Sequence, residues 1–571
     1  MNSVWMVVIA VGSLAAAYKF YSVFIAQKIF KADASNPVPS EELRDDVDYV
    51  PTNKEVLFGH HFASIAGTGP IVGPAIAVIW GWLPALAWII IGSIFAGAVH
   101  DYAALIMSTR NRGVSIGELS RKVINPRVRM LFLFVILFAL WIVVAIFGMV
   151  IAIIFKMYPQ SVFPVWIQIP IAMTVGWLVY RKKANIIILS IIAVALMYLS
   201  IIAGVYFPFN MPGFAGLTPM AVWIILLFIY AYIASVLPVW RLLQPRDYVN
   251  SHQLIIGITL IMLGIFFAHP QVVAPVIQLA PKGAPPLLPF LFITIACGAI
   301  SGFHALVSSG TSSKQLKNEQ DIRFIGYGGM LVEGLLGVLV IVAVTAGIGM
   351  YVKTESGEVL KGVIAWQHHY SSWAAARGLT AKVSAFVNGS ANMLTALGIS
   401  LKYGQAIVGV LIASFAGTTL DTATRIQRYI ITELAVDYKI KPLQKRHPAT
   451  ALAVIAAAAL AFGQGGGTGA LVLWPLFGTS NQLLAGLVLL VASVYLLRKK
   501  SNPAPAVIPM FFMIITSSWA MIINLTNFLK NGRIYLVIVG TFILMLEIWM
   551  IIEAFLCMKT IYSKNKQVRI K

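Results

Sequence analysis

Polar and helix-breaking residues interrupt an apolar segment near the start of the chain. Residues 58–74, FGHHFASIAGTGPIVGP, contain two histidines, a serine and a threonine among four glycines and two prolines. Glycine removes side-chain restraint, and Pro70 cannot donate a hydrogen bond to the preceding turn. Unpaired backbone at bilayer depth is tolerated only inside protein or beside a watery cavity. We therefore expect a helix broken at residues 66–70, with Pro70 opening a half-helix beside a cavity; an ordinary proline kink is the alternative.

A second candidate interruption lies in YAYIASVLPVWRLLQPRDYV, residues 230–249. If one span covers 217–250, Pro238 opens a second half-helix at mid-membrane, although a simple kink is equally compatible. The two spans run in opposite directions, as in inverted five-helix repeats. Two positive helix ends facing one point attract an anion such as a carboxylate. The predicted substrate-binding residues are His61, Ser64, Gly67, Thr68, Gly69, Pro70, Ser235, Pro238 and His304.

Ionisable side chains within the spans are the candidates for ion coupling, because they are costly in lipid and functional by default. A histidine titrates near neutral pH and could carry a proton, or it could simply tie two helices together. Asp101 is expected to pair with an imidazole or with Arg110. Hydroxyls in SGFHALVSSGTSSKQ, residues 301–315, could hold a cation or bond their own helix. The predicted coupling residues are His60, Asp101, Ser308, Ser309 and Glu333.

The elements that position these residues are transmembrane helices. The chain of 571 residues is 59% hydrophobic and 11% charged, against about 25% charged in soluble domains. Runs long enough to cross a bilayer predict fifteen spans: 4–27, 57–82, 83–109, 128–157, 162–180, 184–206, 217–240, 251–269, 287–310, 324–352, 401–424, 448–463, 469–497, 505–528 and 535–558. The less apolar residues 380–398 are predicted to form a re-entrant or surface helix.

The net charge of +22 is explained by membrane topology, because basic residues collect in cytoplasmic loops. With these spans, 32 of the 42 Lys and Arg residues fall on one face. This asymmetry predicts that the N-terminus lies outside and the C-terminus in the cytoplasm. A nucleic-acid partner would need a soluble basic domain, and we see none. The partners expected are the lipid bilayer and a small molecule. Glu547 and Glu553 in the last span are expected to make packing or oligomer contacts.

The predicted fold is therefore all-α and polytopic. It has a core of two inverted five-helix repeats of the LeuT type, one N-terminal helix and about four C-terminal helices. The divisions are 1–50, an N-terminal helix and loop; 51–206, the first repeat; 207–430, the second repeat; and 431–571, the accessory helices. Cys297 and Cys557 both lie in apolar runs and make neither a disulfide framework nor a metal cluster.

Four segments together resemble the carbon starvation protein CstA family over about residues 50–500. They are FGHHFASIAGTGPIVGPAIAVIWGWLPALAW, GAVHDYAAL, ASVLPVWRLLQPRDY and SGFHALVSSGTSSKQ. The resemblance implies an inner-membrane secondary transporter of the amino acid/polyamine/organocation superfamily, not an enzyme. It also implies import of peptides or pyruvate during carbon starvation, with proton coupling in close relatives.

Other classes of protein remain open at this stage. An intramembrane metal or haem protein could use His60, His61, His100 and His304, although His-Glu-x-x-His is absent. A channel would also contain broken helices. No phosphate-binding glycine-rich loop is present, so an ion gradient of H+ or Na+ is the simplest energy source and no cofactor is expected. The sequence does not separate peptide from pyruvate.

Overall fold

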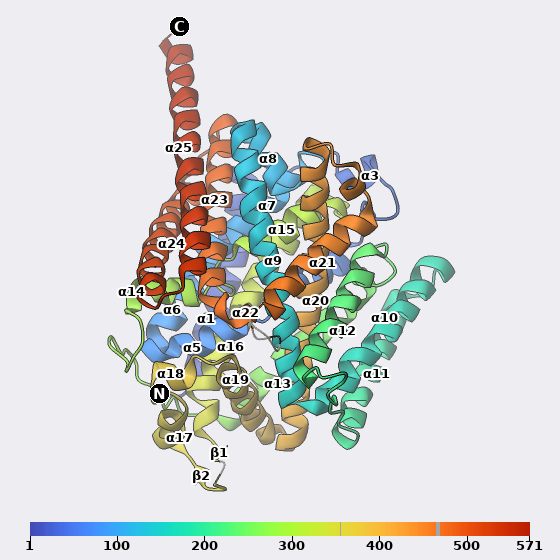
Figure 1. Ribbon diagram of the computed structural model, residues 1–571, viewed down its shortest axis with the longest axis vertical. Coiled ribbons are helices and arrows are strands. Elements are labelled where there is room, and N and C mark those ends of the chain that lie inside the picture. Colours follow the sequence, from blue (N-terminus) through green and yellow to red (C-terminus); the bar gives the residue numbers. More distant parts are fainter. Residues whose placement is uncertain (355, 464–466, 468, 571) are drawn as a thin grey trace.

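The computed structural model describes residues 1–354, 356–463, 467 and 469–570 (Figure 1). Most of the described chain is helical. Within the described residues the only sheet is an antiparallel hairpin of β1 (Val352–Lys353) and β2 (Val359–Leu360). In the part of the chain that the structure describes, twelve helices are long and apolar enough to cross a membrane. The predicted all-α, polytopic class is therefore confirmed.

The helices follow one another along the whole chain. The first part contains α1 (Val4–Ala16), α2 (Ser22–Phe24), α3 (Pro39–Glu42), α4 (Lys54–Ile65), α5 (Gly69–Ala77), α6 (Trp82–Gly92), α7 (Ala98–Thr109), α8 (Ile116–Val123), α9 (Pro126–Met157), α10 (Val162–Lys182), α11 (Ile186–Tyr206), α12 (Pro219–Val236) and α13 (Leu243–Ala268). The second part contains α14 (Leu287–Thr294), α15 (Gly302–Gly310), α16 (Gly329–Thr345), α17 (Gly362–His369), α18 (Trp373–Ala376), α19 (Leu379–Leu394), α20 (Leu401–Asp437), α21 (Arg446–Phe462), α22 (Gly469–Val472), α23 (Trp474–Arg498), α24 (Ala504–Lys530) and α25 (Ile534–Ile570).

All fifteen expected spans correspond to helices. Beyond the twelve uninterrupted ones, α4 and α5 form a bent pair, α14 and α15 form an interrupted pair, and α21 is a shorter apolar helix. The segment predicted as a re-entrant or surface helix, 380–398, forms α19, which is largely buried and packs against α5, α16 and α20.

Side-chain caps fix the beginnings of several spans. At α9, Asn125 accepts a hydrogen bond from the backbone N–H of Val128 (2.9 Å), and Pro126 stands in the first turn. At α12, the Thr218 hydroxyl accepts from the N–H of Ala221 (3.3 Å), again before a proline. These residues satisfy amides that the first helical turn leaves unpaired.

The most buried helices form the centre of the molecule. The most apolar windows of the spans built on α16, α20 and α23 are 89%, 89% and 94% buried, whereas α11 is 28% buried. α20 packs along α9, α4 along α13, and α15 along α23. Figure 1 shows α10 and α11 at one edge of this centre and α24 and α25 at the opposite edge. The interrupted helices thus lie among the best-packed elements.

Candidate functional site

The break predicted in the first candidate segment is present. α4 ends at Ile65, α5 begins at Gly69, and the two helices bend by 46°. Ala66 has a non-helical ψ of 43°. Pro70 stands in the first turn of α5, where its missing N–H leaves no bond unmade. Thr68, at the beginning of α5, is buried.

The glycines of this break allow two chain segments to approach closely. A Cβ atom at Gly69 would lie 2.5 Å from both Cβ and Sγ of Cys297. A Cβ atom at Gly67 would lie 2.6 Å from the hydroxyl of Thr419. Glycine is therefore required here because of space, since only a residue without a side chain leaves room for these neighbours.

The expected second half-helix at Ser235–Pro238 is wrong. α12 ends at Val236, and a turn separates it from α13, which begins at Leu243 as an independent span. Leu237, the residue before the proline, is extended with ψ of 149°, as proline demands of its predecessor. Pro238 therefore terminates a complete span instead of restarting one at mid-membrane.

Ser235, on α12, and the first break contact different parts of α20. Its carbonyl accepts a hydrogen bond from Nη1 of Arg428 (2.9 Å). The break instead contacts Thr419, whose hydroxyl donates to the carbonyl of Ser64 (3.3 Å). Nine residues of helix separate these two contacts of α20, which is about 13 Å. The structure therefore gives Ser235 and Pro238 no place beside Gly69.

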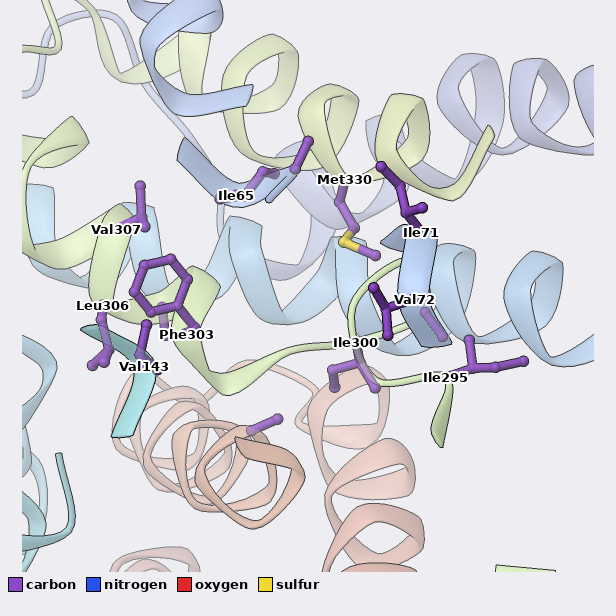
Figure 2. Packing of buried hydrophobic residues seen from close by; sticks show 14 of the residues in the cluster. Ile65, Ile71, Val72, Val143, Ile295, Ile300, Phe303, Leu306, Val307 and Met330 are labelled. Atoms are coloured by element: carbon purple, nitrogen blue, oxygen red, sulfur yellow. The ribbon is translucent and has the colours of Figure 1, made fainter. Parts of the chain in front are cut away.

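The second interruption lies between α14 and α15, in a segment predicted to be continuous. Residues 295–301 are not helical, and Gly298 has a φ of +93° that favours glycine. A Cβ at Gly298 would lie 3.5 Å from Cβ of Pro70, so the two interruptions touch. Figure 2 shows Ile71 and Val72 of α5 beside Ile295 and Ile300 of this segment.

The start of α15 is held by a residue from α23. Oδ1 of Asn481 accepts from the backbone N–H of Phe303 (3.0 Å), and its Nδ2 donates to the hydroxyl of Ser301 (3.0 Å). The sequence marks Asn481 as an unusual polar residue within a span but assigns it no role. The structure gives it one, because it satisfies the half-helix that begins inside the membrane.

Four ionisable side chains form one buried row. Asp101 of α7 bonds Nδ1 of His100 (2.8 Å) through one oxygen and Nδ1 of His304 (3.0 Å) through the other. Nε2 of His304 lies 3.2 Å from a carboxyl oxygen of Glu333 on α16. All four side chains are fully buried. Asp101 thus pairs with imidazoles and not with Arg110.

The hydroxyls of α15 divide into two kinds. Ser309 donates to the carbonyl of Ala305 (2.7 Å) and accepts from the N–H of Ile116 at the start of α8 (3.1 Å), so it ties two helices together. The Ser308 hydroxyl is buried and has no hydrogen-bond partner among the described residues. Of the two predicted coupling serines, only Ser308 therefore has a free hydroxyl.

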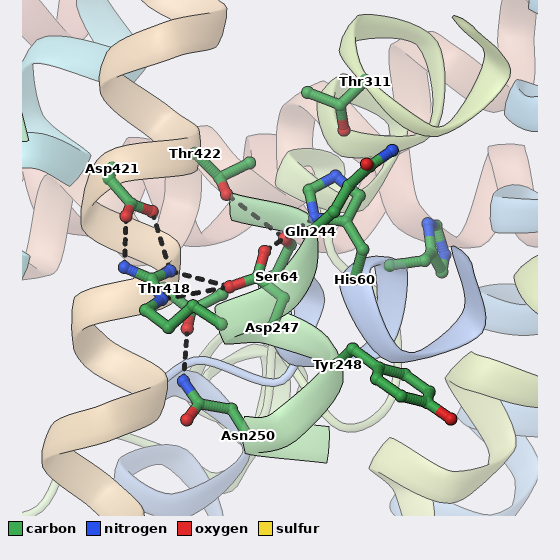
Figure 3. A network of polar contacts seen from close by, with 12 residues as sticks. His60, Ser64, Gln244, Asp247, Tyr248, Asn250, Thr311, Thr418, Asp421 and Thr422 are labelled. Carbon is green, nitrogen blue, oxygen red and sulfur yellow. Dashed lines mark hydrogen bonds and ion pairs between the residues drawn. The ribbon is translucent and has the colours of Figure 1, made fainter. Parts of the chain in front are cut away.

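His60 begins a second buried network, which Figure 3 shows between α4, α13 and α20. Its Nδ1 lies 2.6 Å from Oδ2 of Asp247. Arg246 pairs with Asp247 (Nη2–Oδ1, 2.8 Å) and with Asp421 (Nη2–Oδ1, 3.1 Å), and Tyr230 of α12 donates to Asp421 (2.9 Å). The side chains of His60, Arg246, Asp247 and Asp421 are buried, whereas Tyr230 is partly exposed. The network joins four helices on one side of the breaks.

His61 and Ser64 lie on the same half-helix but bond different partners. Nδ1 of His61 lies 2.9 Å from the hydroxyl of Ser312, just after α15. The Ser64 hydroxyl lies 3.2 Å from that of Thr422 on α20. The structure therefore places His61 and Ser64 in the last turns of α4 and Gly67 in the break, and His61 and Ser64 have different bonding partners.

Arg246 and Asp247 were not identified from the sequence as ionisable residues within the membrane. The expected span began at residue 251, whereas α13 begins at Leu243, so both residues were read as loop. Asp421 and Arg425 lie four residues apart on α20, but they form no ion pair with each other in the described part of the chain. Arg425 instead bonds Asp48 (2.9 Å) in the loop before α4.

A loop closes over the same end of these helices. Asp48 lies 2.9 Å from Arg425 and 3.5 Å from Arg428. Burial would raise the pKa of Asp48, but these two guanidinium groups outweigh it and lower the pKa to about 2. Asp48 is therefore ionised at physiological pH and holds the loop against α20.

The four histidines do not converge on one metal or haem. His60 faces Asp247, His61 faces Ser312, and only His100 and His304 share a partner. One group in the described part of the chain has ligand atoms close enough for an ion: Cys297, His304 and Glu333, within 4.8 Å of one another. Its thiol, imidazole and carboxylate suit a transition metal, and the same distances suit a hydrogen-bonded proton carrier.

A cavity of about 600 Å³ leads to the break from the opposite end. Its lining includes Gly69 and Cys297 of the two interruptions and Arg533, between α24 and α25. The molecule is thus hollow on one side of the two breaks and closed by buried ion pairs on the other.

The family profile described as "Carbon starvation protein CstA" matches residues 2–520. The chain is 34% identical over 543 residues to "Peptide transporter CstA" of Bacillus subtilis, covering 91% of this chain and 90% of that protein. It is 32% identical over 603 residues to "Pyruvate/proton symporter BtsT" of Escherichia coli, covering 94% and 84%. These relatives are transporters by name, not enzymes.

A solved structure supports the fold. The manganese transporter of Eremococcus coleocola superposes with a TM-score of 0.50 at 14% identity, over 91% of this chain and 99% of that one. At this identity the likeness concerns the fold alone. The predicted LeuT-like architecture is confirmed.

Proposed function

The chain belongs to the carbon starvation protein CstA family, and from this premise we propose that it is a proton-coupled secondary transporter that imports small carboxylate-bearing nutrients, peptides or pyruvate, during carbon starvation. Names of relatives support both substrates, since one is called a peptide transporter and another a pyruvate/proton symporter.

One observation carries this proposal: two interrupted helices touch at the bottom of a cavity that is open on one side and sealed on the other. Gly69 of α5 faces Cys297, and the cavity ends there. Beyond the breaks, Arg246–Asp421 and Asp48–Arg425 close the path. Such a one-sided cavity at the centre of two broken helices is what alternating access requires.

We place the N-terminus outside and the C-terminus in the cytoplasm, in the cell inner membrane. The basic residues then collect on the inner side, and the cavity opens outward. The sealed side, with Asp48, Arg425 and Arg428, faces the cytoplasm. In this orientation the structure is outward-open, and import proceeds from the cavity through the inner ion pairs.

The substrate carboxylate is proposed to bind at the start of α5. Residues 67–70 offer a helix N-terminus within the membrane, whose positive dipole end favours an anion. His61, Ser64 and Thr68 stand on the same interrupted helix. The start of α15 is already bonded by Asn481, so α5 is the end available to a substrate.

The proton is proposed to travel on the row of His100, Asp101, His304 and Glu333. Neither carboxyl oxygen of Glu333 has a hydrogen bond with good geometry among the described residues, although His304 lies 3.2 Å away. A proton on the Glu333 carboxyl or on Nε2 of His304 would allow a hydrogen bond between these two side chains, and loss of that proton would remove the bond. Since Cys297 neighbours both the row and the cavity, protonation and substrate arrival are coupled in space.

Uptake into proteoliposomes tests this function. Purified protein is reconstituted, and labelled pyruvate or a labelled dipeptide is added under an imposed pH gradient or an imposed sodium gradient. We expect accumulation with the inside alkaline and none driven by sodium alone. No accumulation of either substrate under any gradient contradicts the proposal.

Glu333→Gln separates coupling from binding. This variant keeps shape and removes the titrating group. We expect it to lose accumulation driven by the pH gradient while it keeps exchange of labelled for unlabelled substrate at equal pH. Glu547→Gln is the matched control, because Glu547 is also buried, on α25, where it bonds Ser518. If Glu333→Gln accumulates substrate normally, the proposed proton path is wrong.

A further inference from the structure

The cavity that reaches the break is lined by several parts of the chain that the core repeats do not include. We call it the outer vestibule and define its mouth by Arg377, Lys382 and Arg533. Lys382 belongs to α19, and Arg533 to the loop between α24 and α25. A second cavity of about 430 Å³ is lined by the same three cations. The C-terminal helices thus contribute directly to the route toward Gly69.

The charges of the outer vestibule are uncompensated. The lining residues include these three cations and no aspartate or glutamate. Within the described chain, no carboxylate forms an ion pair with Arg377, Lys382 or Arg533. By contrast, Arg246 and Arg425 on the closed side are both paired. Among the described residues, the three cations of the vestibule therefore differ from these two buried arginines in having no carboxylate partner.

Of the three cations, Lys382 gives the strongest evidence for a missing anionic partner. It is 7% exposed, and its ammonium lies 5.3 Å from the ring centroid of Trp474. A buried ammonium without a carboxylate is costly unless a partner comes from elsewhere. Since the side chain lines the cavity, the partner that fits is an anion entering from outside.

Amides and indole rings surround the cations. Asn524 and Asn527 of α24, and Asn531 directly after its last residue, are spaced by three and four residues, and all line the vestibule. Trp373 and Trp474 line it as well. Asparagine amides can donate to a carboxylate or pair with a peptide amide, and indole rings offer flat apolar surface.

We propose that Arg377, Lys382 and Arg533 form an outer binding site for the carboxylate of a monocarboxylate or short peptide, occupied before the substrate reaches the break. This inference rests on the proposed function, because it names an earlier station on the same route. The site concentrates anions at the open mouth of the vestibule. The substrate then moves through the cavity to the break at Gly69.

Lys382→Gln tests the site, with Lys402→Gln as the matched control. Lys402 is exposed at the start of α20, outside the vestibule lining, and carries the same charge change. Equilibrium binding is measured on the purified full chain in detergent with labelled pyruvate and a labelled dipeptide. A dipeptide amidated at its C-terminus reports what remains without the carboxylate.

We expect Lys382→Gln to weaken binding of both carboxylates about tenfold or more, as loss of a charge-assisted bond does. In uptake, KM should rise by a similar factor while the maximal rate stays near that of the parent. Lys382→Arg should restore binding, and Lys402→Gln should leave it unchanged. The amidated dipeptide should bind weakly to the parent and be insensitive to Lys382→Gln.

A thermal melt distinguishes a binding role from a structural one. Removing an uncompensated buried charge should keep or raise the melting temperature, whereas loss of a structural contact lowers it. Unchanged affinity in Lys382→Gln, or equal affinity for the amidated dipeptide, overturns the outer site and leaves the proposed function intact. If the parent protein transports neither substrate, the proposed function fails independently of this site.

Discussion

Gly69→Ala is the sharpest test of the contact between the two interrupted helices. The added methyl would lie 2.5 Å from both Cβ and Sγ of Cys297, whereas carbon atoms at optimal separation are about 3.5–4.0 Å apart. The two segments must therefore move apart by about 1 Å or more. Gly69 does not have a positive φ, so alanine suits the backbone and only the space is lacking.

Such overpacking costs about 1–3 kcal/mol. If this energy falls on the conformation in which α5 touches residue 297, its population drops by about 5- to 150-fold. We expect uptake in proteoliposomes to fall by a factor in that range, with normal expression and a single peak in size-exclusion chromatography. Gly417→Ala is the control, because a Cβ at Gly417 meets nothing within 4 Å.

Cys297→Gly removes both atoms that the new methyl would meet. The double variant Gly69→Ala, Cys297→Gly should therefore recover most of the uptake relative to Cys297→Gly alone. This non-additivity is the expected sign of two residues in direct contact. Normal uptake by Gly69→Ala, or no recovery in the correctly folded double variant, would show that the two helices do not meet at Gly69.

Three further predictions address other parts of the molecule. Burial and the neighbouring Arg377 lower the pKa of Lys382 to about 8; Arg533 also faces the vestibule, so exchange at equal pH on both sides should weaken as pH rises through 8, and Lys382→Arg should abolish that dependence. Asp421→Asn removes one carboxylate from a buried arginine and should lower the free energy of unfolding by up to about 3–5 kcal/mol, measured by thermal melting against Tyr230→Phe. Asn481→Ala leaves buried groups of α15 unpaired and should cost about 1–3 kcal/mol with a matching loss of uptake; an unchanged melt contradicts the capping role.

Much of the fold could be predicted because each apolar run has the length that a bilayer imposes. The first break was predictable for a different reason: Gly67, Gly69 and Pro70 carry their backbone preferences in their residue types. Both signals are local. They need no knowledge of which helices are neighbours.

The second break could not be found this way. Residues 295–301, IACGAIS, contain one glycine and no proline, and the interruption depends on contacts from elsewhere. Asn481, 180 residues from Ser301, bonds the start of α15. The prolines in 230–249 gave a stronger local signal for a place where a span simply ends. Tertiary contacts decide which interruptions lie at mid-membrane.

The charged residues of the site could not be predicted for the same reason, because their place within the membrane depends on tertiary contacts. Arg246 and Asp247 lie within α13, but a run containing arginine, aspartate and glutamine scores as loop. They are tolerated in the membrane because each has a partner, Asp421 and His60 respectively. Pairing with a residue of another helix offsets the cost of burying each charge, and a hydropathy profile contains no information about that partner.

The contrast between the two sides suggests how the closed side opens. Separating Arg246 from Asp421 without water would strand two buried charges, which is far more costly than the pair itself. Opening therefore requires water to enter between α13 and α20 as the pair separates. The cations of the outer vestibule have no such partner to lose. On the proposed route, an arriving carboxylate would offset part of that positive charge and favour closure around it, while the inner pairs would set the barrier to opening toward the cytoplasm.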